Sequence, residues 1–146
     1  MSFIENPETP QLKLVSEWNA GFKEKNLDIL GKSLHKDFRR YTYPRSLGQP
    51  VQTKEEWFGH LAKVIDITSE FEQTLHSVIE APGKVVIHAT NEAKNPLGVK
   101  TLRESIYIIH ITDEDGDLKI KQIDEFTDSK TYLEVIKSFE AMKANK

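Results

Sequence analysis

The chain has 146 residues, no cysteine, a formal net charge of −3 and a pI near 6.0. This size and charge favour one domain with a single core and exclude a general nucleic-acid surface, which needs clustered Lys and Arg. The missing cysteines exclude disulfides and thiol catalysis, and no apolar run approaches the roughly 20 residues that span a bilayer. Because residues 1–10 also lack a basic and then apolar leader, we expect a cytoplasmic protein with one domain over residues 1–146 and its core at about 10–139.

The first half of the chain predicts three helices. Apolar residues recur at helical spacing over residues 10–25, and again over residues 27–36 after a capping asparagine. Thr53 and Glu56 form a capping box, in which each side chain accepts a hydrogen bond from the other residue's amide. The apolar stripe that follows predicts the third helix. Residues 39–43 are typical of a short strand between the second and third helices.

From residue 71 the pattern changes to strands joined by turns. Strands are expected over residues 71–81, 85–93, 101–112 and 118–126, and a final helix over about 130–142. Helices followed by consecutive strands predict an α+β fold, with a curved antiparallel sheet wrapped around the N-terminal helices and a cone-shaped hollow between them. The function of the chain then depends on which side chains line that hollow.

The acidic turn at residues 113–117 imitates the start of a calcium loop. Position twelve of such a loop would be Asp124, inside an expected strand, where a calcium loop needs a bidentate glutamate. The histidines show no metal-ligand spacing with a third ligand nearby. We therefore expect a solvated hairpin turn, no metal site and no cofactor.

Three stretches, Tyr43–Pro50, Thr53–Glu56 and Ile123–Ser129, resemble segments common in SnoaL-like proteins of fungi. From Pro10 to about Phe139, the chain resembles the SnoaL-like branch of the nuclear transport factor 2-like superfamily, which includes polyketide cyclases and ketosteroid isomerases. The resemblance implies a cone-shaped fold, a pocket for a small apolar ligand and a homodimer formed through the sheet face. It leaves the reaction open, because the superfamily hosts isomerases, cyclases, dehydratases, hydrolases and binding modules.

The steroid-isomerase chemistry can be compared with this chain residue by residue. In that family a carboxylate just before a proline abstracts the substrate proton, and Tyr43, before Pro44, occupies this position here. A phenol with an ordinary pKa of about 10 is a poor base at neutral pH. The family's oxyanion-donating tyrosine corresponds to Trp18, whose indole N–H can donate a hydrogen bond but cannot exchange a proton. Standard steroid isomerase activity is therefore not expected.

The resemblance favours Glu104 and Glu125 as the remaining acid–base candidates, since both lie within the part of the chain that resembles the fungal proteins. Two carboxylates over an apolar pocket could act as acid and base, with burial raising one pKa. The alternative is that both are surface glutamates paired with Lys121, Arg103 or Lys100. Alternation along the strands leaves open which set of side chains faces the hollow.

Aromatic, histidine and amide side chains complete the candidate pocket. The pocket candidates are Trp18, Tyr41, Trp57, His60, His88, Asn91, Tyr107 and His110. His88 and His110 could pair across neighbouring strands as a proton shuttle, or lie at a sheet surface or dimer interface. The aromatic residues could line a pocket for a flat or polycyclic ligand, or simply form the core.

Three functions remain open at this point. The chain could be a cofactor-independent enzyme that moves a proton in an isomerisation, cyclisation or dehydration of a small apolar, oxygenated molecule. It could bind such a molecule without turnover, or use the open sheet face as an interaction module. We favour the enzyme, with Glu104 or Glu125 as the acid–base group. In that hypothesis Tyr43 orients or protonates a ligand oxygen and Trp18 forms a wall.

Overall fold

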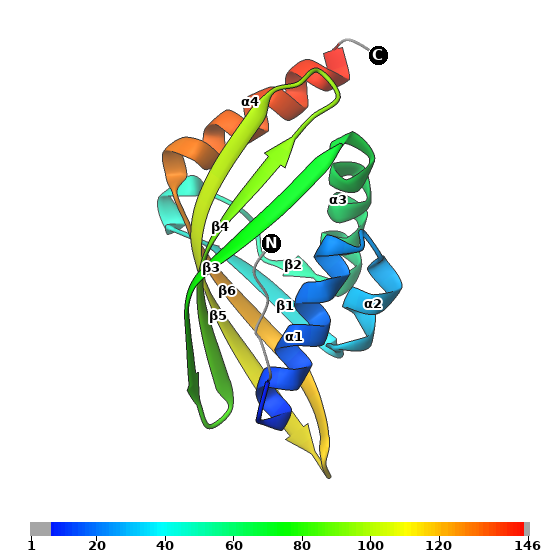
Figure 1. Ribbon diagram of the computed structural model, residues 1–146, viewed down its shortest axis with the longest axis vertical. Helices are drawn as coiled ribbons and strands as arrows, with labels where there is room; N and C mark the ends of the chain where they lie inside the picture. The colour runs from blue at the N-terminus through cyan, green and yellow to red at the C-terminus, as the bar shows by residue number, and fades with distance from the viewer. Residues whose placement is uncertain (1–6, 145–146) are drawn as a thin grey trace.

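The computed structural model describes residues 7–144, which form four α-helices and one six-stranded sheet (Figure 1). The helices are α1 (Pro10–Lys23), α2 (Leu27–Lys32), α3 (Lys54–Ile67) and α4 (Ser129–Ala144), with a short 3-10 helix, η1 (Arg45–Leu47). The strands are β1 (Leu34–Tyr43), β2 (Gln52–Thr53), β3 (Glu70–Ala81), β4 (Lys84–Lys94), β5 (Lys100–Glu114) and β6 (Asp117–Thr127). Figure 1 shows α1, α2 and α3 gathered on one side of the curved sheet, with α4 across its upper end.

The sheet has the strand order β2-β1-β6-β5-β4-β3, and the expected α+β architecture is confirmed. Its pairs are antiparallel, except that β1 and β6 run parallel. The first strand also begins earlier than predicted, because Leu34, assigned above to the second helix, is already in β1. Leu34 pairs with Ile120, whose amide donates to the Ser33 carbonyl at 2.8 Å. This pairing with a distant strand overrides the local helical pattern.

Local signals determine the start of α3 and the turn between β5 and β6. The predicted capping box is present, with the Glu56 amide 3.2 Å from the Thr53 hydroxyl and the Thr53 amide 3.1 Å from the Glu56 carboxylate. The acidic turn is a two-residue hairpin connection in which Asp115 and Gly116 have φ values of 55° and 87°. Asp and Gly tolerate positive φ, which the tight hairpin turn requires.

The core fills the space between α1, α2, α3 and the sheet face that they cover, which we call the inner face. Val15 of α1, Leu30 of α2 and Phe38 of β1 are fully buried. Trp57 of α3 stacks on Phe38 with ring centroids 5.4 Å apart. Helices α1 and α2 approach closely at Gly21, where a Cβ atom would lie 2.6 Å from Leu30 Cγ. Glycine at this position therefore permits the helix contact.

Alternation along the strands divides their residues between the inner face and the opposite, outer face. The inner face carries Val85, Ile87, Ala89, Asn91, Arg103, Ser105, Tyr107, Ile109, Ile123, Glu125 and Thr127. The outer face carries His88, Glu104, Ile106, His110, Asp124 and Phe126. Tyr41 and Tyr43 pair with Asp124 and Phe126, and therefore also lie on the outer face. The structure thus shows which of the two alternating sets of side chains faces the helices, a question that the sequence left open.

Candidate functional site

A cavity of about 130 Å³ lies between α1, α2, α3 and the inner face of β3, β4 and β5. Its wall is largely apolar and includes Phe22, Leu61 and Val64. The polar side chains of the wall include Asn19, Gln73, Asn91, Arg103 and Tyr107. A concave apolar site with a few placed polar groups is the usual form of a small-molecule binding site.

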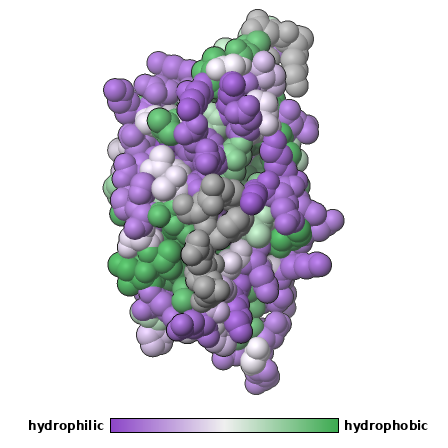
Figure 2. Space-filling model, viewed as in Figure 1, coloured by the Kyte–Doolittle hydropathy of each residue, from purple (hydrophilic) through white to green (hydrophobic). Residues whose placement is uncertain are grey.

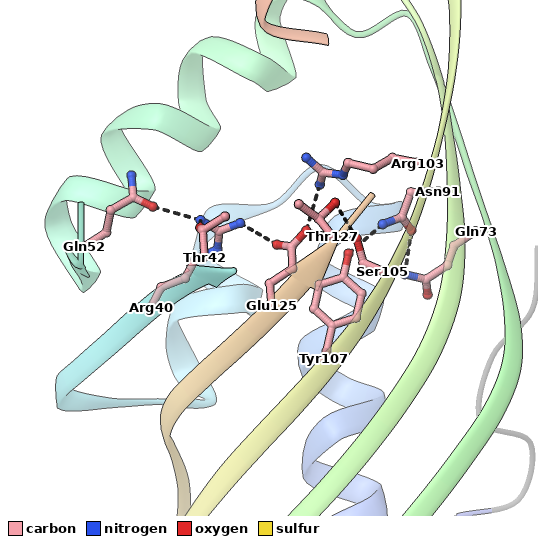
Figure 3. A network of polar contacts seen from close by, with 10 residues as sticks. All are labelled: Arg40, Thr42, Gln52, Gln73, Asn91, Arg103, Ser105, Tyr107, Glu125 and Thr127. Atoms are coloured by element: carbon pink, nitrogen blue, oxygen red, sulfur yellow. Dashed lines mark hydrogen bonds and ion pairs between the residues drawn. The ribbon is translucent and has the colours of Figure 1, made fainter. Parts of the chain in front are cut away.

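Four of these polar residues form a directed chain of hydrogen bonds. Asn19 Nδ2 donates to Gln73 Oε1 at 2.7 Å, and Gln73 Nε2 donates to Asn91 Oδ1 at 2.9 Å. Asn91 Nδ2 then donates to the Tyr107 hydroxyl at 2.7 Å (Figure 3). All three amides are buried. Because the Tyr107 oxygen accepts from Asn91, its own proton is directed elsewhere and can be donated to a ligand.

The environment of Tyr107 keeps its hydroxyl protonated. Burial raises the pKa of Tyr107, and the charge of Glu125 raises it further, while Arg103, Arg40 and the Asn91 hydrogen bond act in the opposite direction. The net pKa lies above the ordinary tyrosine value. At neutral pH the side chain therefore offers a hydrogen-bond donor rather than a phenolate.

Glu125 lies beside this chain in a buried charged cluster (Figure 3). Its side chain is 2% exposed and accepts a hydrogen bond from Arg40 Nη2 through Oε1. Its Oε2 atom accepts from the Ser105 hydroxyl at 3.1 Å and lies 3.4 Å from Arg103 Nη2. Both carboxylate oxygens are thus occupied by donors.

This cluster keeps Glu125 ionised. Burial by itself would raise the pKa of the Glu125 carboxyl, but Arg103, Arg40 and the hydrogen bonds from Arg40 and Ser105 bring it below the ordinary value. A carboxylate with a lowered pKa and both oxygens engaged is a weak proton acceptor. Among the described residues, the cavity wall includes Arg103 but not Glu125. The geometry therefore places Glu125 behind Arg103, where it holds the guanidinium in position.

The two arginines of the cluster differ in how fully they are engaged. Arg40 is 11% exposed, donates to Thr42 and Gln52 at 3.0 Å each, and lies 5.5 Å from the Trp57 ring centroid. Arg103 is 25% exposed, reaches the cavity wall and lies 5.8 Å from the Tyr132 ring of α4. Of the two arginines, Arg103 is therefore the one that a ligand in the cavity can contact.

His60 lies on α3, one turn before the cavity-lining Val64. Burial lowers its pKa, and the positive charges of Arg40, Arg103, Lys63 and Lys143 lower it further. Its imidazole is therefore neutral at neutral pH, and a neutral imidazole can accept a proton.

The structure places several predicted site residues on the outer face instead of in the cavity. Glu104 Oε2 lies 2.5 Å from His88 Nε2, and their side chains are 60% and 37% exposed. His110 Nε2 lies 2.8 Å from Asp124 Oδ2. The two histidines pair with carboxylates rather than with each other. Glu104, His88 and His110 are therefore separated from Glu125 and Tyr107 by the sheet itself.

The predicted aromatic residues are divided in the same way. Tyr41 and Tyr43 stack on the outer face with centroids 6.5 Å apart. Trp57 belongs to the buried core, between Phe38 and Arg40. Trp18 lies in the cavity wall, and its buried indole nitrogen has no hydrogen-bond partner among residues 7–144.

Sequence reasoning missed Arg40, Arg103, Asn19 and Gln73 as site residues. Arg103 was considered only as a surface partner for a glutamate, whereas it pairs with Glu125 in the interior. A usable signal was the alternation of polar residues at positions 103, 105 and 107, since three polar residues with one phase suggest a lined hollow. The amides of α1 and β3 carried no comparable signal.

Across residues 7–144, no three side chains of His, Cys, Asp or Glu converge in a way that could hold a metal ion. No helix in this range combines the length and apolar character needed to cross a membrane.

No protein-family model matches the sequence. Among curated proteins, the chain is similar to the Monooxygenase ptaG of Pestalotiopsis fici, with 23% identity over 133 residues that cover 90% of this chain and 91% of the relative. It is also similar to the Monooxygenase AacuP of Aspergillus aculeatus, with 27% identity over 124 residues, 84% of this chain and 83% of the relative.

Solved structures extend the comparison to the fold. The BvnE pinacolase of Penicillium brevicompactum superposes with a TM-score of 0.75 at 18% identity and 97% coverage of each chain. TerC, co-crystallised with polyporic acid, gives 0.72 at 18% identity, covering 88% of this chain and 99% of TerC. A SnoaL-like polyketide cyclase from Shewanella denitrificans gives 0.72 at 12% identity, with coverage of 89% and 99%. The fold is nuclear transport factor 2-like. The resemblance to SnoaL-like proteins is confirmed at the level of the fold, and proteins from Penicillium share this fold.

Proposed function

We propose that this protein is a cofactor-independent enzyme of the isomerase or cyclase type, which acts on a small apolar, oxygenated molecule held in the cavity. The observation that carries the proposal is the hydrogen-bond chain that ends at Tyr107, with the Arg103 guanidinium in the same cavity wall. Tyr107 donates its proton or a hydrogen bond to a ligand oxygen, and Arg103 stabilises the negative charge that this oxygen carries during the reaction. Fixed donors aimed at a developing oxyanion are a major source of catalysis in proton-transfer reactions.

The other groups have supporting roles in this proposal. Glu125 keeps Arg103 in position and stays ionised. His60 is neutral beside the arginines but is not among the residues of the cavity wall, so it is given no contact with the ligand. Glu104 and Tyr43 lie on the outer face, so the proposal gives them no part in proton transfer.

The structural neighbours support the reaction class. BvnE is described as a pinacolase and the Shewanella protein as a SnoaL-like polyketide cyclase, and both share this fold. TerC was crystallised with polyporic acid, a small oxygenated molecule. An isomerisation or cyclisation moves a proton within the substrate, so neither a cofactor nor a metal is required.

A second candidate function is oxidation of the same ligand by molecular oxygen. The observation that favours it is the name monooxygenase on the fungal relatives described above, whose matches cover most of this chain. Both candidates use the same cavity, and they differ in whether oxygen is consumed. Turnover that stops under anaerobic conditions would select the second candidate.

The test of the first candidate is hydrogen exchange at carbon. Small ketones and enols of one or two rings are incubated with the protein in D₂O, and deuterium entry next to the carbonyl is followed by mass spectrometry. An enzyme of the proposed type accelerates exchange, and Tyr107→Phe loses the acceleration. A protein that binds a probe in the cavity but accelerates no exchange would be a binding protein, which contradicts the proposal.

We further propose that the protein forms a homodimer through the outer face. Phe126 and Ile106 pair in register there and are 56% and 43% exposed. Ile79 at the β3 edge is 59% exposed. Figure 2 shows hydrophobic residues gathered at the left edge of the molecule, on the side where the strands lie in Figure 1. Exposed apolar patches on soluble proteins commonly mark such contacts.

A further inference from the structure

The charges around the cavity do not balance. Two guanidiniums, those of Arg40 and Arg103, share one buried carboxylate, that of Glu125, so the cluster carries one excess positive charge. The largest charge effects on the pKa of the neighbouring His60 come from the positive groups Arg40, Arg103, Lys63 and Lys143. A partly buried excess cation is stabilised by an anion that enters its site.

Of the two arginines, Arg103 is the one able to take a second anion. Arg40 is occupied by Glu125, Thr42 and Gln52, and its guanidinium carbon lies over the Trp57 ring. Arg103 lies farther from Glu125, at 3.4 Å, and its side chain is a quarter exposed in the cavity wall. A guanidinium has five N–H donors, so the contacts of Arg103 with Glu125 and Tyr107 leave others for a ligand.

A second polar group of the cavity wall, the Tyr107 hydroxyl, is also a donor. Asn91 occupies the Tyr107 oxygen, which leaves the phenolic proton for the cavity. A raised pKa keeps that proton in place at neutral pH. A guanidinium and a phenolic O–H in the same wall favour a ligand oxygen that only accepts, and a charged acceptor forms the stronger hydrogen bonds.

The size of the cavity limits the group that carries this oxygen. A volume of about 130 Å³ is close to that of the roughly 150 Å³ apolar cavity that binds benzene in another protein, so the enclosed part holds about one ring. Phe22, Leu61 and Val64 supply apolar contacts for it.

From these observations we propose that the ligand presents an anionic oxygen, either a carboxylate or an ionised enol or phenol, attached to a single ring, and that Arg103 and Tyr107 bind this oxygen. The inference rests on the proposed function, because it names the substrate class of the same cavity. It adds that the ligand enters already ionised, so recognition depends on charge as well as on shape.

Two matched pairs of one-ring probes test the inference by titration calorimetry at neutral pH. Benzoate is compared with neutral benzamide, and dimedone, an ionised enol at this pH, with its neutral methyl enol ether. Each pair keeps the ring and removes the charge. We expect at least one anion to bind about ten-fold more tightly than its neutral partner, because a hydrogen bond to a charged group is stronger by that order. The pair that shows the difference distinguishes a carboxylate from an enolate ligand.

Two variants connect the preference to Arg103. Arg103→Gln should reduce the difference to about two-fold or less. Arg39→Gln removes the same charge from an exposed residue of β1 that bonds to backbone carbonyls, and it should keep the full preference. Circular dichroism on both variants verifies that they are folded. The comparison of probes on the unmodified protein remains decisive even if Arg103→Gln does not fold.

Failure of the anion-binding inference can be distinguished from failure of the proposed function. If the neutral partners bind as tightly as the anions, the inference is overturned while the proposed function of the cavity stands. If neither pair binds at all, both the inference and the proposed function fail. An anion preference that survives Arg103→Gln but disappears in Arg39→Gln would also overturn the inference, because the charge would then act from outside the cavity.

Discussion

The inner and outer faces of the sheet are built from neighbouring residues of the same strands, yet they give carboxylates opposite environments. Asp124 and Glu125 are adjacent on β6, and Glu104 and Ser105 are adjacent on β5. Glu125 is 2% exposed between two arginines, whereas the Glu104 side chain is 60% exposed beside a histidine. A strand turns successive side chains to opposite faces, so one step along the chain decides whether an acid is buried or solvated.

The energetic consequences of the two environments also differ. An exposed contact between polar side chains, such as Glu104 with His88, contributes about 0–1 kcal/mol, because water screens it. In a buried cluster, loss of one partner leaves charges that neither water nor protein compensates. Four experiments test this contrast, and they follow in order of decreasing expected effect.

Glu125→Gln should cause the largest loss. The substitution leaves Arg40 and Arg103 without a counter-charge in the interior, so the free energy of unfolding should fall by about 3–5 kcal/mol. Urea denaturation measures it. The control is Glu104→Gln on the outer face, which should cost about 1 kcal/mol or less. Equal losses for the two variants would mean that burial does not distinguish the faces.

Tyr107→Phe should lower the rate of catalysed exchange about 10²-fold, as loss of one oxyanion donor does in other enzymes. The substitution removes the hydroxyl that ends the hydrogen-bond chain while keeping the ring. Tyr43→Phe makes the same chemical change on the outer face and should leave the rate unchanged. The rate is measured by deuterium entry. Equal losses of rate in the two variants would contradict the role of Tyr107 as hydrogen-bond donor to the ligand oxygen.

Phe126→Asp should convert the proposed dimer to a monomer. A phenyl side chain moved out of water contributes about 1.5–3 kcal/mol, and a carboxylate in its place adds a desolvation cost. Analytical ultracentrifugation at one concentration gives the oligomeric state. Leu133→Asp on α4, an exposed leucine elsewhere, should leave the dimer intact. A wild-type protein that sediments as a monomer would exclude the dimer.

The smallest expected effect is a pH dependence. The folded pKa of Glu125 lies below its ordinary value of 4.5, so its ionised form stabilises the fold fully above that value. The stabilisation is lost as the pH falls through the lower folded pKa, by up to about 1.4 kcal/mol per pH unit. The stability gap between the wild type and Glu125→Gln should therefore narrow on acidification below about pH 4.5. If the free energies of unfolding of the two proteins changed in parallel with pH, the lowered pKa of Glu125 would be contradicted.

Local chemistry made several elements of the fold predictable. The Thr53–Glu56 capping box and the turn at Asp115 and Gly116 are complete within a few residues, and both are present as expected. Leu34 was misassigned because a leucine repeat fits a helix equally well, and its partner Ile120 lies on the last strand. Long-range pairing of this kind leaves no local signal.

The site was less predictable than the fold. Apolar side chains are usually expected to face the interior, whereas on β5 several of them face outward. Its apolar residues Leu102, Ile106 and Ile108 point outward, while Arg103 and Tyr107 point inward. Hydrophobicity alone would have assigned the apolar set to the inner face and the polar set to the outer face. This reversal explains why Arg103 was overlooked and why Glu104 seemed equivalent to Glu125.

The residues expected in the pocket lie in several parts of the molecule. Trp18, Asn91 and Tyr107 lie in the cavity wall, although their role in binding stays a prediction. His88 and His110 are on the outer face, where they pair with carboxylates. The cross-strand registers that separate these sets could not be derived from one sequence.

The amide chain has a polarity that a single atom could reverse. Asn91 donates a hydrogen bond to Tyr107 because its side-chain nitrogen faces the hydroxyl and its side-chain oxygen faces Gln73. In Asn91→Asp the corresponding carboxylate could only accept, so Tyr107 would turn its proton inward and present its lone pairs to the cavity. The Tyr107 hydroxyl would then favour ligand groups that donate hydrogen bonds, while Arg103 would still donate. What Tyr107 offers to a ligand is thus decided by a neighbouring side chain whose shape would hardly change.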